Sequence, residues 1–217
     1  MTKKSSVRHI VGWALVILTV FILLAPAVVA NAEDDETYDT YFDYIIKSYH
    51  VDVVAHADNT YDIVETIDVR FNTYKHGIYR YIPTRYNGKL TPLTNIDTYG
   101  TATKINRHGI YKYIRLGDAD QTIIGDKTYT IAYSIDMGKD ENDGLDAIYL
   151  NIIGADWNTK MYEVTFDVDV SELEGTEMVP SVSVGYEGST GSLGTMVKKT
   201  DSHIIGSMTR ILMPYEG

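Results

Sequence analysis

The chain has 217 residues, 44% of them hydrophobic and 23% charged, which excludes a disordered chain and a polytopic membrane protein and leaves room for one folded domain. A net charge of −11, from 19 basic and 30 acidic residues, argues against a nucleic-acid partner. The chain has no cysteine, which excludes disulfides and thiol chemistry, and its 18 tyrosines beside 4 phenylalanines are typical of strands with one solvent-exposed face.

The N-terminus has the pattern of an export segment, residues 1–32. Three basic residues precede an apolar stretch at 10–25, and the triplet Ala-Asn-Ala at 30–32 is a signal-peptidase site. The alternative is an uncleaved N-terminal anchor helix, because the stretch approaches the length of a membrane span. In both cases we expect the remainder to be exported to the outer face of the cell membrane, with an acidic linker at 33–46 and a folded domain at 47–217.

The first part of the folded domain predicts an antiparallel hairpin at 49–71. Apolar and polar residues alternate on both sides of the turn Asp58-Asn59, so one face is expected to be buried. Glu65 falls on the apolar row, where an unpaired carboxylate would be costly. Arg80 falls on the apolar row of the next predicted strand, 78–82. We therefore expect a structural ion pair between Glu65 and Arg80 across the hairpin.

The predicted strand at 78–82 and a later strand lie in segments of nearly the same sequence. The segment His76 to Pro83 and the segment His108 to Arg115 share the pattern His-Gly-Ile-Tyr-Lys/Arg-Tyr-Ile. One interpretation is a platform for sugar rings or a peptide, built from aromatic faces and cation–π contacts. The other is that cross-strand tyrosine pairs only stabilise a sheet. The tyrosines of the repeat, which are the candidate ligand-binding residues, are Tyr79, Tyr81, Tyr111 and Tyr113.

Strands are predicted along the rest of the chain, and no helical stripe follows residue 46. Turn signals about 8–15 residues apart are typical of an all-β fold. We predict an antiparallel two-sheet β-sandwich of immunoglobulin-like architecture, preceded by the N-terminal hydrophobic helix. The further predicted strands lie at 95–99, 110–116, 129–137, 148–153, 162–170 and 182–186.

No motif predicts a catalytic residue, a metal or a cofactor. The acidic turn at 139–146 fails the register of a calcium loop, because Lys139 takes the first ligand position and Leu150 the last. The histidines after the export segment lack zinc-site spacing. The Gly/Ser loop at 188–194 lacks the order of a nucleophile elbow.

Five blocks of sequence together resemble a known family. They are the strand at 64–71, the segment 77–83, and the blocks at 115–118, 129–133 and 151–157. In order and spacing they resemble the extracytoplasmic domain of the predicted bacterial membrane proteins grouped as domain of unknown function family 2207. The resemblance implies an export signal, a sandwich-like domain outside the membrane and transmembrane helices beyond it. Attachment to the membrane is expected through the N-terminal segment or through spans after Gly217.

Three functions remain open. The first is a non-catalytic interaction or structural domain of a membrane-anchored cell-envelope protein, with an envelope protein or glycan as its partner. The second is a carbohydrate- or peptide-binding module that uses the exposed tyrosines. The third is an envelope hydrolase built on acidic residues. A strip of coplanar tyrosines would favour the second function, a cleft with two facing carboxylates the third, and a featureless surface the first.

Overall fold

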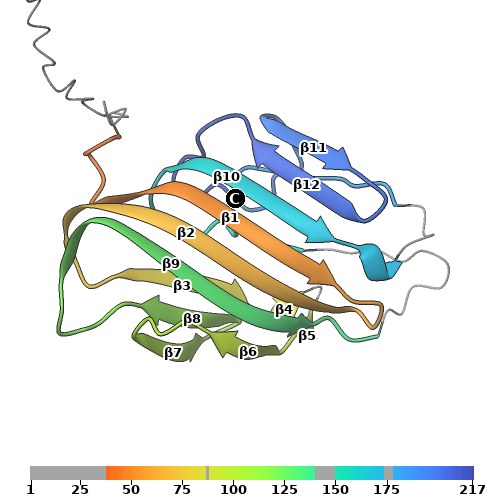
Figure 1. Ribbon diagram of the computed structural model, residues 1–217, viewed down its shortest axis with the longest axis horizontal. Helices are drawn as coiled ribbons and strands as arrows, with labels where there is room; N and C mark the ends of the chain where they lie inside the picture. Colours follow the sequence, from red (N-terminus) through yellow and green to blue (C-terminus); the bar gives the residue numbers. More distant parts are fainter. Residues whose placement is uncertain (1–37, 87, 140–149, 174–177) are drawn as a thin grey trace, which may run out of the picture. The chain divides into compact units, whose positions relative to one another are not determined.

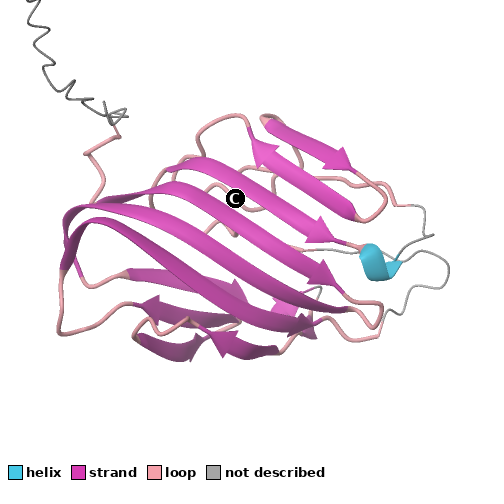
Figure 2. Ribbon diagram, in the orientation of Figure 1, coloured by secondary structure: helices cyan, strands magenta, loops and turns pink. Residues whose placement is uncertain are grey.

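The computed structural model describes residues 38–86, 88–139, 150–173 and 178–217, which are almost entirely strands and loops (Figures 1 and 2). The seven-stranded sheet, called here the large sheet, joins strands from both ends of the described chain. In spatial order these are β11 (Thr195–Lys199), β12 (His203–Met208), β10 (Met161–Asp169), β1 (Tyr44–Ala55), β2 (Thr60–Lys75), β9 (Ile123–Asp136) and β6 (Leu93–Asp97).

A second, three-stranded sheet, called here the small sheet, is built from the middle of the chain. Its order is β3 (Ile78–Pro83), β8 (Tyr111–Leu116) and β7 (Thr103–His108). A two-residue pairing of β4 (Arg85–Tyr86) with β5 (Lys89–Leu90) and one 3-10 turn, η1 (Ser171–Leu173), complete the described elements.

The predicted hairpin is confirmed as β1 and β2, which pair antiparallel from Tyr44 opposite Phe71 to Ala55 opposite Tyr61. Asn59 turns the chain with a φ of 65°, a left-handed conformation that asparagine tolerates well. The hairpin begins earlier than expected, because residues 44–46 of the predicted linker already belong to β1.

The prediction of purely antiparallel sheets is wrong, because β1 pairs with β10 in parallel. Their register runs from Ile46 opposite Met161 to Val54 opposite Asp169. A two-residue alternation is the same in parallel and antiparallel strands, so the sequence pattern carries no information on direction. The mixed large sheet and the division into seven and three strands differ from the expected immunoglobulin-like arrangement of two antiparallel sheets.

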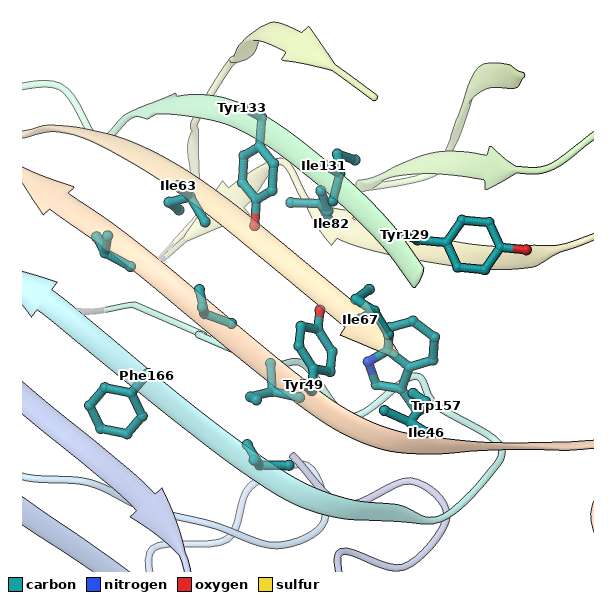
Figure 3. Packing of buried hydrophobic residues seen from close by; sticks show 14 of the residues in the cluster. Ile46, Tyr49, Ile63, Ile67, Ile82, Tyr129, Ile131, Tyr133, Trp157 and Phe166 are labelled. Carbon is teal, nitrogen blue, oxygen red and sulfur yellow. The ribbon is translucent and has the colours of Figure 1, made fainter. Parts of the chain in front are cut away.

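One hydrophobic core contains residues from both sheets. Tyr49, Ile67 and Ile131 enter it from the large sheet, and Ile82 enters it from the small sheet (Figure 3). Trp157, from the irregular segment before β10, packs edge-on against Tyr49 with the ring centroids 5.6 Å apart. The core is therefore enclosed by two sheets and by a loop.

Two predicted strands are not strands in the structure. In the described part of 148–153 and throughout 182–186 the chain is irregular, although Ile153 and Val184 are buried. These segments cover the core as loops, and Val184 is held by a backbone hydrogen bond to Gly191. Their apolar residues reflect burial without a strand. The sequence pattern also missed β7, β11 and β12; β7 is exposed along its whole length and so carries no alternation.

The predicted N-terminal helix and most of the predicted linker lie outside the described residues. Within the described ranges, no helix has the length and apolar composition needed to cross a bilayer.

Candidate functional site

Glu65 and Arg80 lie in direct contact in the core. Their exposed fractions are 0% and 2%. The Arg80 Nε donates to Oε2 of Glu65 at 2.8 Å and to Oε1 at 3.1 Å, and Nη2 donates to Oε1 at 2.9 Å. The pair does not cross a hairpin, as the sequence suggested, because β2 belongs to the large sheet and β3 to the small sheet. It joins the two sheets.

Two tyrosines complete the environment of the Glu65 carboxylate. Tyr49 donates its hydroxyl to Oε2 at 2.6 Å, and Tyr133 donates its hydroxyl to Oε1 at 2.5 Å. They come from β1 and β9, the strands on either side of β2, and their hydroxyls point toward one another in Figure 3. Burial raises the pKa of both hydroxyls well above the usual value, so both stay protonated donors.

The remaining side of Arg80 is closed by backbone. Nη1 donates to the carbonyl oxygen of Tyr81 at 2.7 Å, and a Cβ on Gly154 would lie 3.0 Å from the same nitrogen. Gly154 also has a φ of 79°, which strongly favours glycine. The Glu65–Arg80 network is thus enclosed by protein, and it holds the sheets together without presenting a surface to a ligand.

The accessible candidate is the outward face of the small sheet, called here the tyrosine face. On β3, residues 78, 80 and 82 point into the core, so residues 79, 81 and 83 point outward. Residues directly opposite one another in a sheet share a face. The cross-strand rows of the tyrosine face are therefore Tyr79–Arg115–Lys104, Tyr81–Tyr113–Asn106 and Pro83–Tyr111–His108.

Three of the four predicted tyrosines form one ring cluster on this face. The rings of Tyr79 and Tyr113 are stacked, with centroids 4.8 Å apart and planes 20° apart. Tyr81 packs edge-on against Tyr113, also at 4.8 Å. Partial burial is the main cause that raises the pKa of Tyr113. The neighbouring hydroxyls of Tyr79 and Tyr81 raise this pKa further. Tyr79 ends the stack and is 44% exposed to solvent.

Tyr111 lies on the same face but in different surroundings. Burial first, and then the negative charges of Asp156 and Glu187, raise its pKa. Both carboxylates are exposed and belong to loops outside the small sheet. The tyrosine face therefore has an acidic end near Tyr111.

The structure brings no metal site together in the ranges it describes, where no cluster of three or more histidine and carboxylate side chains has the geometry to hold an ion. His56 lies between two carboxylates, with Nδ1 at 2.9 Å from Glu172 and Nε2 at 3.0 Å from Asp62. Both ring nitrogens are used, so this group is an ion-pair bridge. The acidic turn at 139–146, which fails the register of a calcium loop, lies outside the described residues after Lys139.

The fold and the site define an all-β domain with a buried ion-pair network between its sheets and an aromatic outer face. The chain belongs to the family described as "Predicted membrane protein (DUF2207) N-terminal domain", which matches residues 45–205. This confirms the resemblance carried by the five sequence blocks. No curated protein matches the chain.

The solved structures that partly resemble this chain include a hydrolase and a metallopeptidase. Leukotriene A4 hydrolase from yeast, solved with bestatin, is 10% identical, with a TM-score of 0.46 over 82% of this chain and 29% of that one. An M1 zinc metallopeptidase from Deinococcus radiodurans is 9% identical, with a TM-score of 0.34 over 76% of this chain and 38% of that one. The chain spans less than half of either structure, and scores this low establish neither a common fold nor a common function.

Proposed function

We propose that this domain is a non-catalytic, sandwich-type binding module of a membrane-anchored cell-envelope protein, and that it binds carbohydrate through the tyrosine face. The observation that carries the proposal is the stacked pair Tyr79–Tyr113, with planes 20° apart and Tyr79 at its open end. An exposed aromatic ring gives a sugar ring a flat apolar surface, and its hydroxyl adds a polar contact.

The rigidity of the small sheet supports this proposal. The opposite side of β3 is fixed by Arg80, which is bonded to Glu65 on the other sheet. A binding surface held by a packed scaffold loses little side-chain freedom when a ligand arrives. Tyrosine adds to this advantage because it has only two side-chain torsions.

Location outside the membrane is supported by the pattern of the first 32 residues, where basic residues, an apolar stretch and a small-residue triplet follow one another. The family description supports membrane attachment. An envelope location would place the tyrosine face within reach of cell-surface glycans.

Affinity electrophoresis of the chain through gels containing cell-envelope polysaccharides tests this function. We expect retardation that Tyr79→Ala weakens by roughly tenfold, which corresponds to about 1.4 kcal/mol. The matched control is Tyr74→Ala, which removes an exposed tyrosine from β2. The proposal fails if no polysaccharide retards the chain, or if Tyr74→Ala weakens binding as much as Tyr79→Ala does.

A purely stabilising role for the ring cluster gives a different result. Cross-strand aromatic pairs contribute roughly 0.2–1 kcal/mol to a sheet. In that case Tyr79→Ala lowers the unfolding temperature and no glycan binds the parent chain.

A further inference from the structure

We propose that the glycan recognised by the tyrosine face is acidic: a polysaccharide with carboxylate or phosphate groups, whose sugar ring lies on Tyr79 and whose charged group is bound by Arg115 and Lys104. This inference rests on the proposed function and adds the chemical class of the ligand. The observation behind it is the row Tyr79–Arg115–Lys104, which places Arg115 directly beside the exposed ring and Lys104 beside Arg115 on the next strand.

The tyrosine face differs in charge from the rest of the chain. Its nine positions include Lys104, Arg115 and His108 and no acidic residue, whereas the whole chain has 30 acidic and 19 basic residues. A cationic and aromatic surface on an acidic protein is complementary to an anionic ligand. Distant acidic groups are screened beyond about 8 Å at physiological salt, so the charges in direct contact dominate.

Arg115 is partly exposed beside Tyr79. Its Nε is buried, so the terminal nitrogens Nη1 and Nη2 are the part of the guanidinium that would bind an anion. A guanidinium offers five donors in a planar fork that matches a carboxylate or a phosphate. Lys104 is exposed on the neighbouring strand β7, where a mobile ammonium can reach the same anion.

The tyrosine face is polarised along the strands. Arg115 and Lys104 lie at one end. The other end holds His108 and Tyr111, and the charges of Asp156 and Glu187 act on Tyr111 there. An anionic group is attracted to the first end and repelled from the second. The ligand is therefore expected to lie with its charge beside Tyr79 and its uncharged part toward Tyr111.

Other anionic partners fit the face less well. Insertion into lipid needs aliphatic or tryptophan side chains, and Pro83 is the only aliphatic residue of the nine positions on this face. Nucleic acid carries a phosphate charge for about every 1.7 Å of duplex and is bound by neutralising many phosphates. Two or three cations on an acidic chain suit a polymer with far sparser charge.

The test uses acidic and neutral forms of the same sugar. Binding of the full chain is measured by affinity electrophoresis against polygalacturonate and its methyl ester, alginate, glycerol teichoic acid and neutral dextran. We expect retardation by at least one acidic polymer, tenfold weaker binding of uncharged forms, and a fivefold or greater loss of acidic binding in Arg115→Gln and in Lys104→Gln. The control is Lys198→Gln, which removes an exposed lysine from β11 and is expected to change nothing.

The outcomes separate this inference from the function on which it rests. Equal binding of charged and uncharged forms, unaffected by Lys104→Gln, overturns the acidic ligand and leaves carbohydrate binding intact. Failure of every polymer to bind overturns both. Tighter binding to anionic phospholipid vesicles or to single-stranded DNA than to any polysaccharide also overturns the inference. Lys104 lies on the exposed strand β7. The binding measured for Lys104→Gln therefore does not depend on the stability of the core.

Discussion

Replacing Arg80 with methionine is expected to destabilise the domain by about 3–5 kcal/mol, the usual cost of removing one partner of a buried ion pair. The structure explains the size of this effect. The change removes all three N–H···O contacts to Glu65 and leaves a fully buried carboxylate with only the hydroxyls of Tyr49 and Tyr133. In a domain of this size such a loss lowers the unfolding temperature by roughly 6–20 °C.

The double variant Glu65→Leu with Arg80→Met is expected to be more stable than either single variant, because no buried charge is then left without a partner. Urea unfolding followed through the fluorescence of buried Trp157 measures all three, and Arg70→Met, an exposed arginine on β2, is the control. Two results would refute the reasoning: a cost below about 1 kcal/mol for Arg80→Met, or single costs that simply add in the double variant.

Three further predictions concern separate features. Tyr133→Phe removes one hydrogen bond to a charged group and is expected to cost about 1.5–3 kcal/mol, measurable by urea unfolding. Gly117→Ala is expected to disrupt the pairing of β3 with β8, because the new Cβ would lie 2.0 Å from the backbone oxygen of His76 and the φ is 140°; a loss of native near-UV circular dichroism would show it. Protonated His56 donates to the carboxylates of Glu172 and Asp62, and these hydrogen bonds, that to Glu172 first, raise the pKa of His56. Its stabilising contribution, under about 1 kcal/mol, is therefore complete below pH 6.5 and is lost as the pH rises through the raised pKa; an NMR titration finding a pKa at or below 6.5 would contradict this.

The strands that the sequence predicted correctly are those with one buried and one solvent-exposed face. The β1–β2 hairpin, β9 and β10 alternate clearly, because one face is buried in the core and the other meets water. The same contrast revealed that Glu65 and Arg80 both point inward. The relative direction of neighbouring strands and their pairing partners were not predictable. Alternation does not distinguish parallel from antiparallel pairing, and it does not show to which of the two sheets β3 belongs.

The tyrosines of the candidate site were predictable, but its basic residues and its arrangement were not. The repeat identified the four tyrosines, yet only the register of β3, β8 and β7 shows that Tyr79, Tyr81 and Tyr113 cluster and that Tyr111 stands apart. Lys104 was missed because β7 is exposed throughout and shows no strand pattern. Tyr49 and Tyr133 were missed as partners of Glu65 because they lie on two other strands, and the sequence gives no sign that those strands flank β2.

The parallel pairing of β1 with β10 also sets the order in which the chain can complete its structure. About a hundred residues separate the end of β1 from the start of β10, and a ribosome adds roughly 5–20 residues per second. For about 5–20 s after β1 and β2 emerge, the long edge of β1 has no neighbour and its backbone groups are available to any other extended chain. A nascent chain with this topology therefore has a time window for mispairing, and holding it unfolded until residue 169 has been made would close that window.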